Sequence, residues 1–334
     1  MDKRKFGNNS FSVSPLGLGI AALGRPGYIN LGHADDLNHD YDITKMEDQA
    51  HIVLDAAWDA GIRYFDVARS YGRAEDFLGS WLASRKIDPD LIIVGSKWGY
   101  TYTAGWQTEL ADGQKHEVKE HSLIVLQRQI TESRSLLGKY LTLYQIHSAT
   151  LDSNVLTNQA VLNELGRLQR KGLVIGFTTS GVDQAETIWQ ALDVRVDNVP
   201  LFSSVQATWN LLEQSAGPAL QAAHEAGLGV IIKETLANGR LTSRNRSPEF
   251  QHQLSLLEAE AKDRHSAVDA ISLAAVLQQP FVDVALSGAV RIDHLQSNLQ
   301  AMELDRGESM EDLLDQLEQP AEEYWTNRSQ MSWN

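Results

Sequence analysis

The stretch IRYFDVARSYGRAEDFLGSWLASRKIDPDLIIVGSKW, residues 62–98, decides the fold. It begins with an apolar run at 62–68, continues with a helical pattern at 74–85 and ends with a second apolar run at 91–98. A strand, a helix and a strand in this order predict two parallel strands joined by a crossover helix.

The same unit recurs along the whole chain. Several of the strand-like runs are almost continuously apolar, such as LIIV and GVII, which is typical of strands buried on both faces. Eight units predict a closed (β/α)8 barrel, the TIM barrel, with an open doubly wound sheet as the alternative. The predicted strands are 16–22, 62–68, 91–98, 141–147, 174–179, 204–209, 229–234 and 282–287. The predicted helices are 47–60, 74–85, 122–137, 155–170, 183–192, 219–226, 267–278 and 293–302.

The segments outside this rhythm also carry predictions. Residues 3–11, around Gly-Asn-Asn, indicate a β-hairpin before the first barrel strand. The long segments 99–121 and 237–265 each follow a strand, so they belong to the C-terminal face of a barrel, where active sites are built. No linker interrupts the chain, which predicts one domain over 1–334. Its last part, 307–334, is expected either to line the substrate pocket or to be partly disordered.

Composition narrows the class of protein. The 334 residues include 29 Lys and Arg against 44 Asp and Glu, a net charge of −15, which disfavours nucleic acid and anionic membranes as partners. There is no cysteine, which excludes disulfides, thiolate metal sites and a cysteine nucleophile. No apolar run approaches the roughly 20 residues of a membrane span, and no targeting segment is evident. We therefore expect a soluble, cytoplasmic protein.

Two motifs point in misleading directions. GLGIAA at 17–22 matches a dinucleotide-binding fingerprint, but the helix that should follow is excluded by GRPG at 24–27. YDITK at 41–45 has the Tyr and Lys spacing of short-chain dehydrogenases, without a nucleotide loop upstream.

The sequence lacks the common motifs for metal, phosphate and serine-nucleophile chemistry. The ten histidines form no HExxH pattern, and neither GxxxxGK[ST] nor GxSxG occurs. We predict no metal site.

The strongest signal is a set of polar residues at strand ends. Asp66 ends RYFDV, Lys97 ends IVGSK and His147 ends LYQIH. Tyr71 follows Asp66 by five residues. Each residue alone could be a strand cap or a surface ion pair. Because a barrel gathers the C-terminal ends of neighbouring strands on one face, and because a buried lysine needs a partner, the set predicts a shared site.

These motifs, FDVARSYG (65–72), SKWG (96–99) and YQIHSA (144–149), resemble those of the aldo-keto reductases. The resemblance is collinear from LGLGIAALG (16–24) to SGAVRIDHLQSNLQA (287–301). It implies a (β/α)8 barrel that binds an extended nicotinamide cofactor without a Rossmann domain. It also implies reduction of a carbonyl group, or the reverse oxidation, by direct hydride transfer.

The resemblance implies a role for each of the four polar residues. Tyr71 would be the general acid, although the ordinary pKa of a phenol, near 10, is high for work at neutral pH. We expect the Lys97 ammonium to lower that pKa, and Asp66 to hold Lys97 charged and in place. His147 would donate a hydrogen bond to the substrate oxygen and stabilise the developing negative charge.

The cofactor positions carry over with departures. Thr178 and Thr179 stand where the family has Ser-Asn facing the carboxamide, and Gln206 matches its carboxamide-binding glutamine. Lys233 stands where relatives often place an aromatic ring that stacks on the nicotinamide, so Trp209 or another aromatic would substitute, or the ring is held differently. The further predicted contacts are Leu236, Arg240, Gly288, Arg291, His294 and Asn298, with Arg244 and Arg246 in the loop expected over the pyrophosphate.

A helix N-terminus with an arginine beside it suits a 2′-phosphate, so the prediction is NADP(H), with NAD(H) less favoured. The pocket would be lined by Trp98, Tyr100, Trp106 and Trp325, which suits sugars, aromatic aldehydes or terpenoid carbonyls. The predicted protein is an NADP(H)-dependent oxidoreductase acting on a small carbonyl or alcohol. The alternative is a nucleotide-binding regulatory or sensor protein on the same barrel.

Overall fold

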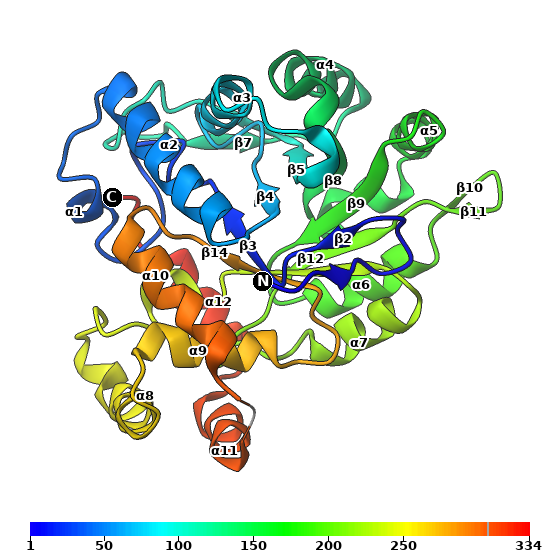
Figure 1. The fold of residues 1–334 in the computed structure, drawn as a ribbon. Helices are drawn as coiled ribbons and strands as arrows, with labels where there is room; N and C mark the ends of the chain where they lie inside the picture. Colours follow the sequence, from blue (N-terminus) through cyan, green and yellow to red (C-terminus); the bar gives the residue numbers. More distant parts are fainter. Residues whose placement is uncertain (306) are drawn as a thin grey trace.

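A computed structural model describes residues 1–305 and 307–334 and contains a closed barrel of eight parallel strands in the order β12-β13-β14-β3-β4-β5-β8-β9 (Figure 1). The (β/α)8 prediction is confirmed and the open sheet is wrong. Each predicted run contains one barrel strand, and β8 extends two residues beyond its prediction. The strands are β3 (Leu16–Gly19), β4 (Tyr64–Asp66), β5 (Ile93–Trp98), β8 (Leu141–Ala149), β9 (Val174–Thr179), β12 (Ser204–Thr208), β13 (Gly229–Lys233) and β14 (Val284–Ser287).

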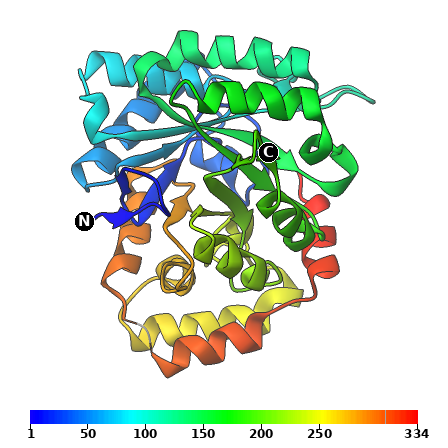
Figure 2. The ribbon, with the colours of Figure 1, turned by 90° about the vertical axis from the view of Figure 1, so that its right-hand side faces the viewer.

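Helices surround the barrel in both views (Figure 1, Figure 2). Some of these helices start after a capping side chain that the hydrophobic pattern does not reveal. The first long helix begins at Ile43 rather than at residue 47, because the Asp42 side chain accepts the N–H of Lys45. The eight crossover helices are α2 (Ile43–Asp59), α3 (Ala74–Ser84), α4 (Leu123–Leu137), α5 (Gln159–Gln169), α6 (Gln184–Leu192), α7 (Gly217–Glu225), α9 (Val268–Leu277) and α10 (Ile292–Gln300).

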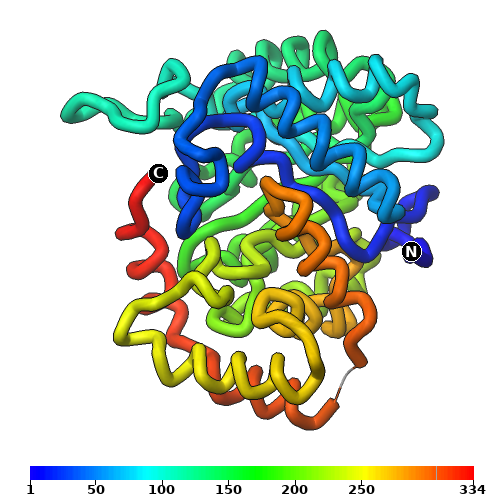
Figure 3. The backbone as a smooth tube through the Cα atoms, turned by 60° about the vertical axis from the view of Figure 1, so that its left-hand side comes forward, coloured from blue at the N-terminus to red at the C-terminus, as the bar shows by residue number. Residues whose placement is uncertain are grey.

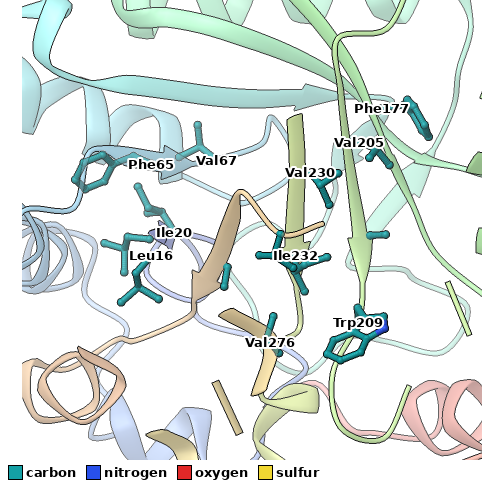
Figure 4. Close-up of a cluster of buried hydrophobic side chains, with 14 of the residues drawn as sticks. Leu16, Ile20, Phe65, Val67, Phe177, Val205, Trp209, Val230, Ile232 and Val276 are labelled. Atoms are coloured by element: carbon teal, nitrogen blue, oxygen red, sulfur yellow. The ribbon is translucent and has the colours of Figure 1, made fainter. Parts of the chain in front are cut away.

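The alternation of side chains along the strands divides the core into two parts. On β4, Phe65 points outward into the shell between the barrel and the helices, where its ring centroid lies 5.6 Å from that of Trp81. Figure 4 shows part of this shell, including Phe65 and Val205. Tyr64, the preceding residue of the same strand, points into the barrel and joins a second, smaller cluster.

The N-terminal hairpin closes one end of the barrel. Its strands, β1 (Arg4–Lys5) and β2 (Ser12–Val13), pair antiparallel, and the hairpin lies across the middle of Figure 1. The side chain of Phe6 is completely buried there. It packs so closely on Gly229 that a Cβ at this glycine would lie 2.4 Å from the ring.

The long connections contain structure of their own. In the segment 99–121, β6 (Tyr100–Tyr102) pairs with β7 (Glu117–Lys119), and the segment 237–265 contains α8 (Gln251–Asp263). Residues 307–334, expected either to line the substrate pocket or to be partly disordered, contain α11 (Glu308–Leu317) and α12 (Ala321–Ser329). The chain ends beside the loop after β3 (Figure 3), where Asn334 exchanges two backbone hydrogen bonds with Tyr28. The remaining α-helix and β-strands are α1 (His33–Asp36), β10 (Arg195–Val196) and β11 (Val199–Pro200). Among the described residues, no helix is both long and apolar enough to cross a membrane.

Candidate active site

A buried ion pair lies at the C-terminal end of the barrel. Lys97 on β5 donates through Nζ to the carboxylate of Asp66 on β4 and to the backbone oxygen of Val67 at 2.9 Å. The side chains are 0% and 3% exposed. Burying two charges is tolerated when both are paired and hydrogen-bonded, which is the arrangement here.

Asp66 has further donors. The hydroxyl of Tyr64 donates to it at 3.2 Å, and Nε2 of Gln206 donates at 2.9 Å. Gln206, predicted to hold the carboxamide of a cofactor, therefore already uses one of the two N–H groups of its side-chain amide. The Asp66 carboxylate is held by three residues from three strands.

Tyr71 and His147 meet beside this pair. The Tyr71 hydroxyl lies 3.4 Å from Nε2 of His147, and the two rings meet edge to face with centroids 5.4 Å apart. The Lys97 ammonium lies 4.9 Å from the centroid of the Tyr71 ring. The structure thus brings the side chains of residues 66, 71, 97 and 147 together on one face of the barrel.

The electrostatics of Tyr71 differ from the expectation. Burial, and after it the Asp66 carboxylate, raise the pKa of Tyr71 well above its ordinary value of 10. Lys97, expected to lower this pKa, is paired with the Asp66 carboxylate, and the net direction of the shift is upward. The phenol is therefore protonated at neutral pH, the form that a general acid requires.

His147 is a neutral imidazole at physiological pH. Burial, followed by the positive charges of Lys97 and Lys233, lowers the pKa of His147 well below its ordinary value. Its Nδ1 lies 3.5 Å from the hydroxyl of Ser70. A neutral imidazole has one N–H to donate, so it can serve as a hydrogen-bond donor without adding charge.

Lys233 ends β13, where an aromatic ring would be expected. It donates to Oγ1 of Thr208 at 2.8 Å, and burial lowers the pKa of Lys233 to about 8. The ring of Trp209 packs instead against Phe281 in the hydrophobic core, with centroids 5.8 Å apart. The ring of Trp325 on α12 lies near the ammonium, with its centroid at 5.9 Å.

The sequence interpretation missed the ion pair beside Lys233. Arg328 on α12 donates to both oxygens of Glu234 at 2.5–3.0 Å. Although burial raises it, the charges of Arg328 and Lys233 lower the pKa of Glu234 to about 2. This pair fastens the C-terminal helix to the end of β13.

The two threonines at the end of β9 differ in their partners. Oγ1 of Thr178 accepts the backbone N–H of Ser148 at 2.7 Å, so it is engaged within the protein. Oγ1 of Thr179 is buried with no partner. Only Thr179 has a hydroxyl with its full hydrogen-bonding capacity left for a ligand.

The arginines of the loop after β13 are partly engaged. The Arg240 guanidinium lies 4.2 Å from the centroid of the Tyr324 ring, and its Nη2 is buried without a partner. Arg244 forms a bidentate ion pair with Asp36, in which its Nη1 and Nη2 lie 2.7 and 2.5 Å from the two carboxylate oxygens. Its Nη2 also lies 2.9 Å from Nε2 of His294. Arg246 pairs with an acidic residue of α8 at 3.7 Å.

The residues around α10 are engaged as well. Asn298 accepts from Ser287 at 2.7 Å and donates to Asp269 at 2.8 Å. Arg291 pairs with Asp293 at 2.9 Å on the surface. An adenine or a phosphate at this helix would have to compete with these contacts.

These positions nevertheless fit an extended anionic ligand. The hydroxyl of Thr179 and Nη2 of Arg240 are buried and unpartnered. Around Gly288, a Cβ would meet no atom within 4 Å, so the backbone there is open to approach. The α10 N-terminus, capped at Arg291, has no side-chain cap, which leaves backbone N–H groups to bind an anion. Leu236 is half-buried and packs on the core.

The predicted pocket residues lie in different environments. The ring of Tyr100 lies 4.9 Å from that of His147, so it borders the site, and Trp325 borders it from α12. Trp98 is fully buried in the core shell rather than in a pocket wall. Trp106 is partly buried, and its ring meets a phenylalanine of α3 edge to face at 6.3 Å.

Arg25 is a site residue that the sequence interpretation missed. GRPG was interpreted only as a stop to a helix, yet the Arg25 guanidinium is buried and lies 5.2 Å from the centroid of the Tyr71 ring. The available signal was a cation in the loop after the first barrel strand of an acidic protein. Among residues 1–305 and 307–334, no group of three His, Asp or Glu is placed to hold a metal ion.

Comparison with known proteins accounts for this arrangement. The family model described as "Aldo/keto reductase family" matches residues 16–318. The chain belongs to the aldo/keto reductase family. Relatives of this aldo/keto reductase include the uncharacterized oxidoreductase YqkF of Bacillus subtilis (strain 168), 25% identical over 90% of this chain and 91% of the relative. Pyridoxal 4-dehydrogenase of Microbacterium luteolum is 27% identical over 72% of each chain.

Solved structures share the fold of this aldo/keto reductase. The holo form of aldo-keto reductase AKR11C1 from Bacillus halodurans superimposes with a TM-score of 0.70, at 21% identity, over 96% of this chain and 97% of that one. A putative aldo-keto reductase from Pseudomona aeruginosa, PA4992, superimposes with a TM-score of 0.61 at 24% identity, over 91% and 95% of the two chains. At these identities the likeness concerns the fold.

Proposed function

We propose that this aldo/keto reductase is an NADP(H)-dependent oxidoreductase that reduces an aldehyde or ketone, or oxidises the corresponding alcohol, with Tyr71 as the general acid and base. The observation that carries the proposal is the convergence of one phenol, one neutral imidazole and one buried ion pair on a single face. A sensor needs to bind a nucleotide but needs no proton donor beside it.

The chemistry divides between the cofactor and the chain. A bound nicotinamide cofactor supplies the hydride that adds to the carbonyl carbon. As the C=O bond becomes a C–O single bond, the O–H bond of Tyr71 breaks and its proton goes to the carbonyl oxygen; the tyrosinate then regains a proton from water. His147 donates a hydrogen bond to the same oxygen and stabilises its developing negative charge. In the oxidation, the Tyr71 oxygen removes the hydroxyl proton of the alcohol.

The preference for NADP(H) is proposed from the basic residues near α10. Arg244 and His294 hold the carboxylate of Asp36, and a 2′-phosphate has the charge and the oxygens to take the place of that carboxylate. Fluorescence titration with NADPH and NADH tests this assignment. We expect tighter binding of NADPH, and we expect Arg244→Met to weaken NADPH binding while leaving NADH binding nearly unchanged. Tighter binding of NADH by the unaltered protein would overturn it.

The substrate class is proposed from the rings that border the site, Tyr100 and Trp325. They favour a carbonyl compound with an aromatic or sugar-like face, and the name of the pyridoxal 4-dehydrogenase relative adds pyridoxal to the compounds worth testing. The test is NADPH consumption with a panel of aldehydes, ketones and aldoses, and NADP reduction with the matching alcohols. Tight NADPH binding without turnover on any member of the panel would favour the sensor alternative.

A further inference from the structure

A buried carboxylate lies at the end of the loop that carries Tyr71. Glu75 belongs to the first turn of α3, and its side chain is 0% exposed. Nothing in the proposed reaction uses this side chain. Because buried ion pairs can often be replaced by apolar side chains of similar volume without loss of stability, packing alone does not account for it. Its contacts indicate what the charge holds in place.

Both oxygens of Glu75 accept hydrogen bonds from the elements around the site. Oε2 accepts from Nη1 of Arg69 at 2.6 Å. Oε1 accepts from the hydroxyl of Ser96 at 2.6 Å and from that of Ser133 at 2.7 Å. Ser96 precedes Lys97 on β5, and Ser133 lies on α4. The carboxylate therefore connects the loop after β4, the strand of the buried lysine and a helix of the outer shell.

The ion pair between Arg69 and Glu75 closes the loop around Tyr71. The two residues lie on either side of Tyr71 in the sequence, so their side chains join the two ends of the segment 69–75. The backbone N–H of Arg69 also donates to the carbonyl oxygen of Lys97 at 3.1 Å, which fixes the start of the segment to β5. Since a closed loop has fewer conformations than an open one, the pair restricts the directions in which the phenol can point.

Arg69 has a second partner of a different kind. Its Nε donates at 3.0 Å to the carboxylate of Glu132 on α4, whose side chain is 41% exposed. This pair joins the loop to an outer helix but does not join the two ends of the loop. Water surrounds it, so it should contribute little to the rigidity of the site. One guanidinium thus contacts two carboxylates, of which only Glu75 closes the loop.

We propose that Glu75 is a positioning residue for the reaction, and that its pair with Arg69 holds the phenol of Tyr71 beside the imidazole of the site. This inference rests on the proposed function, in which Tyr71 gives and takes the proton. Glu75 contacts none of the reacting atoms and acts through the loop that it closes. A displacement of about 1 Å in a reacting group can lower a rate by about 10²-fold, so a looser loop should slow the proton transfer.

The first test makes the same substitution in the two partners of Arg69. Glu75→Gln removes the charge that closes the loop, and kcat should fall by about 10- to 100-fold. KM and the dissociation constant for NADPH should change by less than about twofold, because the effect is confined to the transition state. Glu132→Gln, the matched control, leaves the loop closed and should leave kcat unchanged. Unchanged kcat in Glu75→Gln, or an equal loss in both variants, would overturn the proposal.

A loss of stability alone is separated from positioning by Ser133→Ala. This variant removes a buried hydrogen bond of Glu75 and leaves its pair with Arg69 intact. The melting temperature should fall, while kcat should stay at the value of the unaltered protein. If kcat fell in Ser133→Ala as far as in Glu75→Gln, the buried carboxylate would act on the stability of the fold and not on the loop.

Hydrogen exchange measured by mass spectrometry requires no turnover. In Glu75→Gln, the backbone amides of residues 67–74 should exchange about tenfold faster than in the unaltered protein, whereas those of β9 and α7 should keep their rates. Faster exchange throughout the protein would show that Glu75 only stabilises the fold, and would contradict the inference. Faster exchange confined to the loop, in a protein that reduces no carbonyl compound, would contradict the proposed function while supporting the role of Glu75 in holding the loop.

A variant of the arginine keeps the test decisive if Glu75→Gln does not fold. Arg69→Lys keeps a counter-ion for the buried carboxylate but lacks the guanidinium that contacts Glu75 and Glu132 together. We expect kcat to fall by about fivefold, as for one weakened hydrogen bond, with faster exchange in residues 67–74. The kcat and exchange rates of Arg69→Lys would refute the positioning role if they equalled those of Glu132→Gln.

Discussion

The two ends of the barrel differ in what fills them. At the N-terminal end, most of the inward side chains are apolar and in mutual contact, and the hairpin closes the opening. At the C-terminal end, the inward side chains are charged or polar and hold one another through hydrogen bonds. The apolar end is formed by Phe6, Val13, Tyr64, Ile93, Leu143, Ile231, Val284 and Leu286. The polar end contains Asp66, Lys97, His147, Gln206 and Lys233.

One side chain belongs to both ends. The ring of Tyr64 packs in the apolar cluster, with its centroid 6.3 Å from that of Phe6, while its hydroxyl donates to Asp66. The apolar cluster therefore lies directly beneath the buried ion pair and contacts it through Tyr64. The difference between the ends indicates that the residues for stability and the residues for chemistry lie at opposite ends of the same eight strands, as is general for this architecture. Variants at the two ends should accordingly have different effects.

The largest expected effect is the loss of turnover in Tyr71→Phe. Phenylalanine keeps the ring that contacts Arg25 and Lys97 but has no proton to transfer. General acid catalysis contributes about 10²- to 10⁴-fold to the rate of a reaction, so kcat should fall by at least about 10²-fold. The melting temperature and the dissociation constant for NADPH should change little. These are measured by NADPH consumption, thermal unfolding and fluorescence titration. Retained turnover would remove Tyr71 from the mechanism.

At the other end, Phe6→Ala should reduce stability and spare the chemistry. Phe6 is fully buried against Gly229, so its removal leaves a cavity and should lower the free energy of unfolding by about 3–5 kcal/mol. Urea unfolding measures this loss, and kcat/KM of the folded fraction should stay within about twofold of the unaltered enzyme. Phe6→Leu, which fills more of the space, should be less harmful. A large loss of kcat/KM at unchanged stability would show that the two ends are not separable.

The sequence predicts the two ends unequally well. All eight strands could be located because an apolar run marks each one, and Asp66, Lys97 and His147 could be assigned to one face because barrel geometry aligns strand ends. The pairing of Arg328 with Glu234 could not, since 94 residues separate them and α12 carries no recognised motif. The direction of the pKa shift of Tyr71 also escaped, because it depends on burial and on counter-ions rather than on spacing.

The smallest effect expected is a pH dependence confined to the polar end. The pKa of Glu234 is lowered to about 2 from an ordinary 4.5, so between these values the unfolded chain binds a proton that the folded protein does not. The stabilisation by the pair with Arg328 is therefore complete well above pH 4.5 and is lost as the pH falls toward 2, by about 3 kcal/mol. Urea unfolding at pH 6 and at pH 3.5 measures this loss.

Glu234→Gln should be less stable at pH 6, since Arg328 is then buried without its counter-ion, but should lose less stability than the unaltered protein between pH 6 and pH 3.5. Phe6→Ala should lose as much between these pH values as the unaltered protein, because no ionisable group is removed at the apolar end. If Phe6→Ala altered the pH dependence of stability and Glu234→Gln did not, the charges at the polar end would be coupled to the packing of the apolar end. The two ends would then not be separable.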